Sequence, residues 1–259
     1  ALEMYTLQCR NHILKPLADK YGIDTSDQAI RAAVEQHNEV CRLIRAIGDF
    51  RKEANPRVTG YEFHILTMVS YVAPKYLIVD KLRETLEEIK TREPDAADKY
   101  RARVVFVGSE VDDVDVIRLV EESGAYVCAD RFCYGSLPGR DEILLNDDED
   151  VVKQVCRQVQ GRAQCPRYWD MAKMTGRRDY VADLAKEYGA DGIIYEQMKF
   201  CDPWAYERMI GTIVLRDEHG YPVLAVDRPY SIGSSGQMRT RVQAFVESIE
   251  IKKIQGGKK

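Results

Sequence analysis

Four short runs of β-forming residues, separated by helical stretches, constrain the fold of this chain most strongly. The runs lie at 104–107, 125–129, 192–195 and 222–226. Between the first two, Val114, Ile117 and Val120 recur at helical spacing, and Gly124 is a suitable helix C-cap. Strands that alternate with helices build βαβ units and hence a parallel sheet. The pattern predicts an α/β fold, with a parallel-sheet Rossmann- or flavodoxin-like domain over residues 99–259.

Residues 1–98 are predicted to be mainly helical and to precede the sheet domain. Thr25 and Gln28 resemble a capping box, and apolar residues from 30 to 44 then follow one helical face. Cys41 lies on that face and is expected to be a core residue. A second helix is expected after Pro74. Because the chain begins without methionine in an already ordered pattern, we expect this segment to continue a domain that lies upstream.

The composition is that of an ordinary globular protein, with 45% hydrophobic and 31% charged residues. The net charge of −4 argues against nucleic acid as the principal partner, since no basic excess is available for phosphates. No apolar stretch approaches the ~20 residues that span a bilayer, and no signal peptide is evident. The seven cysteines are odd in number and irregularly spaced, which favours a reducing cytoplasm over a disulfide framework.

The segment 199–204 places a cysteine at the end of the third β-forming run. Asp202 is a plausible N-cap and Pro203 suits the first helical position, so Cys201 is expected beside a helix N-terminus. Such a position favours the thiolate, which is the form that binds metals and iron–sulfur clusters. The alternative is a buried apolar cysteine, because free cysteine is among the most buried residue types.

The strands' carboxyl ends share one edge of a parallel sheet, so loops 109–113, 130–136 and 200–202 should converge there. Cys133 and Cys201 therefore share this edge, and Cys165 could approach it along a longer connection. Cys128 lies within its strand and is expected in the core. No CxxC pair occurs among these cysteines, so the pattern does not indicate a self-contained zinc or ferredoxin-like site.

A fourth loop, 230–237, is rich in glycine and serine and leads into a helix that carries Arg239 and Arg241. A strand, such a loop and a helix N-terminus can form an anion site. The spacing matches neither the GxGxxG fingerprint nor the Walker A loop, so neither an NAD site nor ATP binding is inferred here. The alternative is a tight turn with both arginines on the surface.

Five ordered motifs resemble the benzoyl-CoA reductase/2-hydroxyacyl-CoA dehydratase family, and the likeness covers nearly the whole chain. The ending after Gly236 is most similar to the smaller cluster-bearing subunit of ATP-dependent benzoyl-CoA reductases. The motifs are Val105-Phe106-Val107-Gly108-Ser109-Glu110, Ala129-Asp130-Arg131-Phe132-Cys133-Tyr134-Gly135-Ser136, Cys165-Pro166-Arg167, Lys199-Phe200-Cys201-Asp202-Pro203 and Gly236-Gln237-Met238-Arg239-Thr240-Arg241.

The resemblance implies a cytoplasmic enzyme of an anaerobic prokaryote, built as a heterodimer of two homologous subunits that carry [4Fe-4S] clusters. A separate ATP-hydrolysing iron–sulfur activator, with ferredoxin as electron source, would supply single electrons. Cys201 matches the family's C-terminal cluster cysteine. Cys9 is an imperfect match to a more N-terminal ligand, and Cys133 is a further metal-ligand candidate.

The implied reaction is reduction of the benzoyl-CoA ring by single-electron steps. The alternatives are dehydration of a 2-hydroxyacyl-CoA through a ketyl radical, or a non-catalytic subunit that relays electrons or completes the complex. No side chain supplies an electron at the potential needed, so a cluster must do so. In the fourth loop we expect Ser234 and Gln237 to act as catalytic residues, and Gly236 and Arg239 to bind the acyl-CoA.

Overall fold

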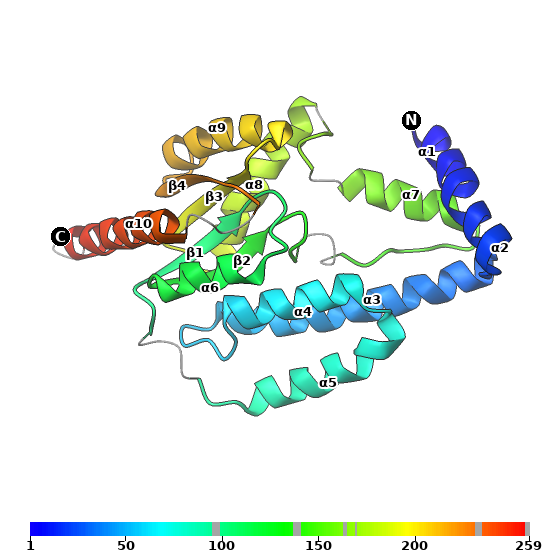
Figure 1. Ribbon diagram of the computed structural model, residues 1–259, viewed down its shortest axis with the longest axis horizontal. Coiled ribbons are helices and arrows are strands. Elements are labelled where there is room, and N and C mark those ends of the chain that lie inside the picture. Colours follow the sequence, from blue (N-terminus) through cyan, green and yellow to red (C-terminus); the bar gives the residue numbers. More distant parts are fainter. Residues whose placement is uncertain (95–98, 137–140, 163–164, 169, 231–234, 257–259) are drawn as a thin grey trace.

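A four-stranded parallel sheet forms the centre of the protein (Figure 1). The computed structural model describes residues 1–94, 99–136, 141–162, 165–168, 170–230 and 235–256. The strands are β1 (Ala102–Val107), β2 (Ala125–Arg131), β3 (Gly192–Met198) and β4 (Val223–Arg228). Their order is β2-β1-β3-β4, and all three pairings are parallel. This order confirms the predicted fold class and is that of a flavodoxin-like sheet, with its switch point between β1 and β3.

Helices account for most of the remaining described chain, and they include the predicted helical segment at the start. They are α1 (Leu2–Cys9), the π-helical turn η1 (Arg10–Leu14), α2 (Lys15–Tyr21), α3 (Asp27–Asp49), the 3-10 turn η2 (Phe50–Lys52), α4 (Gly60–Val72), α5 (Lys75–Thr91), α6 (Val114–Glu122), α7 (Val151–Arg162), α8 (Met171–Glu187), α9 (Asp202–Asp217) and α10 (Ser235–Gly256). The proposed capping box of α3 was wrong by one residue, because the Ser26 hydroxyl accepts from the Ala29 N–H.

Two layers of helices cover the sheet, one on each face. Val104 and Phe106 of β1 pack with residues of α6 and α10. Val105 and Val107 point to the opposite face and pack with α8 and α9. Consecutive strand residues alternate between faces, so a run that is apolar at every position is buried on both sides. This burial explains why the β-forming runs were readable in the sequence.

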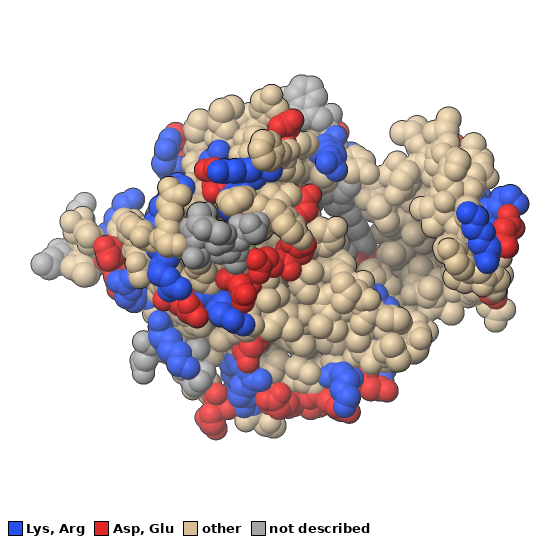
Figure 2. Space-filling view, viewed as in Figure 1, with Lys and Arg blue, Asp and Glu red and all other residues tan. Residues whose placement is uncertain are grey.

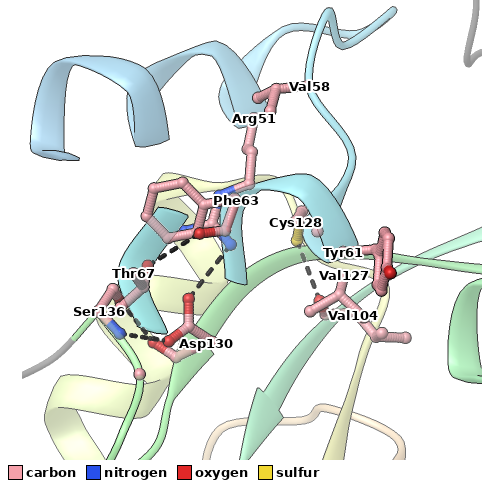
Figure 3. A network of polar contacts seen from close by, with 12 residues as sticks. Arg51, Val58, Tyr61, Phe63, Thr67, Val104, Val127, Cys128, Asp130 and Ser136 are labelled. Carbon is pink, nitrogen blue, oxygen red and sulfur yellow. Dashed lines mark hydrogen bonds and ion pairs between the residues drawn. The ribbon is translucent and has the colours of Figure 1, made fainter. Parts of the chain in front are cut away.

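The initial helices dock on β2 through a buried ion pair (Figure 3). Arg51 and Asp130 are 1% and 3% exposed, and Arg51 Nη1 lies 3.2 Å from Asp130 Oδ1. The guanidinium carbon lies 3.6 Å from the centroid of the Phe63 ring. The Tyr126 hydroxyl donates to the Val58 carbonyl, 2.8 Å away. These contacts hold α3 and α4 against the sheet domain.

A carboxylate from α6 caps the start of α4. Glu121 accepts hydrogen bonds from the N–H groups of Gly60, Tyr61 and Val127, at 2.8, 3.1 and 3.2 Å. The first two N–H groups belong to the first turn of α4, where an anion is favoured by the helix dipole. Burial nevertheless raises the pKa of Glu121 to about 7, and the three donors oppose that rise.

Helices α1 and α7 form a separate lobe that faces the carboxyl ends of the strands (Figure 1). Cys9 of α1 and Cys156 of α7 share a small apolar cluster in this lobe. The space-filling surface is hollowed between the lobe and the body that contains the sheet (Figure 2). None of the helices in the described part of the chain is both long and apolar enough to cross a bilayer.

Replacing Arg51 with methionine should lower the free energy of unfolding by about 3–5 kcal/mol, because Asp130 would stay buried without its cation. Urea denaturation monitored by circular dichroism measures the loss. The double variant Arg51→Met/Asp130→Asn should recover part of it, since neither residue of the pair then carries a charge. A double variant as unstable as Arg51→Met would show that packing of the arginine, rather than charge pairing, dominates.

Glu121 should make stability depend on pH between about 4.5 and 7. In this window the folded state holds a proton on Glu121 that the unfolded state has released, so the free energy of unfolding rises as the pH falls. The contribution is at most about 1.4 kcal/mol per pH unit. Urea titrations across this window should show the slope in the native protein and its loss in Glu121→Gln. Equal slopes in the two proteins would contradict the raised pKa.

Candidate functional site

The candidate site lies at the carboxyl edge of the sheet, beside the switch point, and a buried carboxylate of β3 organises it. Glu196 is fully buried, and its Oε2 accepts from both the N–H and the hydroxyl of Ser109, each at 3.0 Å. Its Oε1 lies 2.9 Å from Nε of Arg228, which is also buried. The Ser109 hydroxyl accepts in turn from the Met198 N–H at 2.8 Å. The ends of β1, β3 and β4 are thereby joined.

Gly108 is required by the same carboxylate. A Cβ atom at this position would stand 2.4 Å from Glu196 Oε2, which is closer than real Cβ contacts allow. The glycine between the first strand and Ser109 therefore serves close approach of the backbone to Glu196.

Arg228 also fixes the two loops that leave this edge. Its guanidinium donates to the carbonyls of Glu110, Pro229 and Tyr230. The Tyr230 hydroxyl donates to Asp112 at 2.8 Å, which ties the loop after β4 to the loop after β1. One buried arginine thus sets where both loops begin.

Cys201 follows β3 in a tight turn and begins α9. Its N–H donates to the Met198 carbonyl at 3.1 Å, and Phe200, at the third position of this turn, has φ +70° with its side chain 96% exposed. The left-handed conformation is strained for a bulky residue. Cys201 is itself the N-cap of α9, so the expectation that Asp202 is the N-cap was wrong by one residue.

The thiol of Cys201 is placed beside a helix N-terminus as predicted, but its pKa is not lowered. Burial raises the pKa of Cys201, and the Trp204 backbone N–H opposes this rise. Burial likewise raises the pKa of Cys133 to about 11. The negative charge of Glu110 adds to both pKa shifts, which places this carboxylate near both sulfurs.

Cys133 and Cys201 come from different segments and lie beside α9, and Cys165 lies within electrostatic range of both. Cys133 and Cys201 pack against the apolar cluster that contains Trp204, as expected for a shared edge. Cys165 influences the pKa of both other thiols and so lies near them. Its segment also reaches toward the α1 lobe, since Tyr168 influences the pKa of Tyr5. Cys128 is fully buried within β2, as predicted.

The remaining predicted site residues lie elsewhere. Cys9 packs with Cys156 in the α1–α7 lobe and not with Cys201. Ser234 lies outside the described residues. Gly236 and Gln237 belong to the first turn of α10, and Arg239 forms a half-exposed ion pair with Glu122 of α6 at 2.8 Å. None of the described contacts brings these three residues to the cysteines.

Two polar atoms at this edge fit an additional group. Within the described ranges, Trp204 Nε1 and Glu110 Oε2 are buried and make no hydrogen bond of full geometry, and the indole N–H approaches only the Cys133 sulfur. Both residues lie beside the thiols of Cys133 and Cys201. Among described side chains, no group of three or more histidines, cysteines and carboxylates is arranged to hold a metal ion. The fit to a cluster therefore rests on Cys201, whose sulfur accepts from the Trp204 backbone N–H. The other ligands of a cluster are not identified among the described side chains.

Reasoning from sequence missed Glu196, Trp204 and the environment of Glu110. A carboxylate placed directly after an apolar β-forming run, as Glu196 follows Tyr195, was a usable signal of a buried polar group. Trp204 lies in the segment 199–204 but directly after the family motif, which ends at Pro203, and no spacing marked its indole as part of a site.

The sequence comparisons identify the family. Residues 1–249 match the family described as 2-hydroxyglutaryl-CoA dehydratase, D-component. The chain belongs to this family.

Relatives share low identity with the chain over most of its length. The (R)-phenyllactyl-CoA dehydratase beta subunit of Clostridium sporogenes is 25% identical, over 88% of this chain and 59% of its own length. The beta subunit of (R)-2-hydroxyglutaryl-CoA dehydratase from Acidaminococcus fermentans is 24% identical, over 95% and 64%. One of the benzoyl-CoA reductase subunits of Thauera aromatica is 22% identical, over 93% and 62%. The chain thus spans about three-fifths of the length of these relatives.

Replacing Gly108 with alanine should lower the free energy of unfolding by about 1–3 kcal/mol, because the new methyl group must displace Glu196. Thermal and urea denaturation measure the loss. Gly176→Ala is the matched control: nothing lies within 4 Å of its Cβ position in α8, so it should be neutral or stabilising. A Gly108→Ala protein as stable as the control would contradict the close approach.

Proposed function

We propose that this chain is an iron–sulfur subunit of an acyl-CoA dehydratase or reductase complex, with a [4Fe-4S] cluster bound at Cys201. The observation that carries the proposal is the position of this thiol. It caps α9 at the carboxyl edge of a parallel sheet, with two further cysteines beside it. Ligands of open α/β sheets bind at this edge.

When bound, such a cluster supplies single electrons at low potential to an acyl-CoA. The chain's own residues have complementary roles in this proposal. Cys201 holds one iron, and the Trp204 backbone N–H donates to its sulfur. Glu110 Oε2, buried and without a hydrogen-bond partner among the described atoms, would lie beside the bound group. Dehydration and ring reduction both require proton transfer, which a carboxylate at this edge can serve.

Dehydration of a 2-hydroxyacyl-CoA is the reaction we place first. The matched family is named for a dehydratase component, and two of the three relatives described above carry dehydratase names. Ring reduction of benzoyl-CoA, the first expectation from the sequence, remains the second candidate because of the Thauera aromatica relative.

The proposal includes partners. The relatives are named as single subunits of dehydratases and of a reductase, which indicates complexes, so we propose a homologous cluster-bearing partner subunit. An ATP-hydrolysing iron–sulfur activator, reduced by ferredoxin, would deliver the electrons. Cys9 and Cys133 remain proposed as further ligands. Ser234 and Gln237, with Gly236 and Arg239, remain proposed contacts for the acyl-CoA.

The deciding measurement is iron, acid-labile sulfide and low-temperature EPR on the anaerobically purified full-length protein in its complex. We expect roughly four irons per cluster. Cys201→Ser should lose iron or change the EPR signal, because a thiolate ligand is removed. Cys41→Ser, which alters a buried core cysteine of α3, is the control and should leave iron and signal unchanged.

Iron and EPR signal that do not respond to Cys201→Ser would make this cysteine a packing residue and overturn the proposal. With a cluster present, turnover of 2-hydroxyacyl-CoA thioesters but not of benzoyl-CoA supports the dehydratase. The reverse selectivity supports the reductase. If Cys201→Ser removes the cluster from this chain and the complex keeps its turnover, the chain is a structural partner.

A further inference from the structure

The outer face of α9 is apolar where a surface helix is usually polar. The helix lies at the outer margin of the molecule, with the sheet on one side of it (Figure 1). Trp204 and Leu215 of its inner face are buried in the core on that side. On the outer face, Tyr206, Met209 and Ile213 are 68%, 57% and 49% exposed. A helix that is apolar on both faces is typical of one that is covered on both sides.

The exposed positions of α9 have the spacing of a helix–helix contact. We call this row the α9 seam, which consists of Asp202, Tyr206, Met209, Ile213 and Arg216. Its members are separated by four, three, four and three residues, which is the alternation by which two helices pack against each other. The seam is apolar at its centre and charged at its ends, as protein–protein interfaces are. The expected occupant is therefore another helix.

The charges at the ends of the seam make it complementary to itself. Asp202 begins the seam, Arg216 ends it and Met209 lies midway between them. If a second α9 lies antiparallel with a two-fold axis at Met209, Asp202 of each copy faces Arg216 of the other. A parallel arrangement would place like charges together, which is unfavourable. Arg216 also contacts Asp217 on its own helix at 2.7 Å, but both side chains are more than half exposed and remain accessible.

The size of the seam suits a weak symmetric dimer. An aromatic side chain contributes about 150–250 Å² when buried, so a contact that covers the whole seam on both copies buries about 1,000 Å² in total. This area is the lower limit of a specific interface, and we expect micromolar affinity. Val72, Tyr76 and Leu77 are also exposed, but they flank the turn between α4 and α5 and do not share this spacing.

We propose that the outer face of α9 is a dimerisation surface, on which a second copy of this chain docks its own α9 antiparallel with the two-fold axis at Met209. This inference does not rest on the proposed function, because it requires neither a cluster nor an acyl-CoA. The occupant is an identical chain and not the homologous subunit proposed above. Since Cys201 caps α9, the cysteine-containing edges of the two copies lie at opposite ends of the paired helices.

The first test measures the oligomeric state of the purified protein by sedimentation velocity. Between about 1 and 100 µM, where interfaces of this size dissociate, we expect a concentration-dependent equilibrium of monomer and dimer. Met209→Glu places a charge at the axis and should raise the dissociation constant of the dimer by at least about tenfold. Because Met209 is exposed in the single chain, circular dichroism should show an unchanged fold.

An exchange of charges tests the antiparallel register. Arg216→Glu and Asp202→Arg should each weaken the dimer by about fivefold, because like charges then meet at both ends of the seam. An equimolar mixture of the two variants should recover the native affinity as a heterodimer, because each end again joins opposite charges. Native mass spectrometry distinguishes this heterodimer by its mass.

Leu77→Glu is the matched control. Leu77 of α5 is 61% exposed and lies outside the seam, so the dissociation constant should not change. A protein that stays monomeric throughout, or a dimer that does not respond to Met209→Glu, would overturn the proposal. A native complex from which Met209→Glu releases a different subunit would also overturn it, because the face would then belong to that subunit. None of these outcomes affects the proposed function, which the iron assay decides.

Discussion

The ion pair between Glu196 and Arg228 is the interaction on which the functional edge depends. A carboxylate in a central strand must be paired where it is buried, and Arg228 and Ser109 supply the cation and the donors. This pairing also constrains neighbouring residues. Gly108 is needed so that the backbone can approach Glu196, and Arg228 holds the carbonyls at the start of two loops. The strand ends that frame the site are thus placed by one buried charge and its partners.

Much of the fold was predictable because its signals are local. A strand that is buried on both faces must be apolar at nearly every position, so the runs that became β1 to β4 could be recognised in isolation. Gly124, with φ +94°, ends α6 as its position after the periodic stretch suggested. The errors were of one residue at helix starts, where Ser26 and Cys201 proved to be the N-caps. Neighbouring residues at a helix start compete for the cap, and tertiary packing decides between them.

The site was predictable only where topology alone could place its residues. Cys133 and Cys201 follow two strands of a parallel sheet, so their common edge could be inferred before the structure was known. The surroundings of Trp204 could not be predicted, because they depend on a guanidinium from β2 that meets its ring. The distance between Cys9 and Cys201 depends on how the α1–α7 lobe packs, and no periodicity encodes that packing.

The carboxyl edge combines paired buried charges with groups left unpaired or strained. Glu196 and Arg228 neutralise each other, while Trp204 Nε1 and Glu110 Oε2 lack partners in the described structure, and Phe200 adopts a strained backbone beside Cys201. Each of these three departures costs free energy.

The buried Arg51 at the docking contact also leaves guanidinium nitrogens without hydrogen-bond partners, but the Phe63 ring stacked on it offers compensation that the protein itself supplies. The Trp204 indole N–H approaches only the weakly accepting Cys133 sulfur, and no described group compensates Glu110 Oε2. Natural proteins break local rules mainly where a ligand or partner offsets the cost. The unpartnered Glu110 oxygen and the strained Phe200 backbone stand beside two thiols, which is the arrangement expected where an additional group binds.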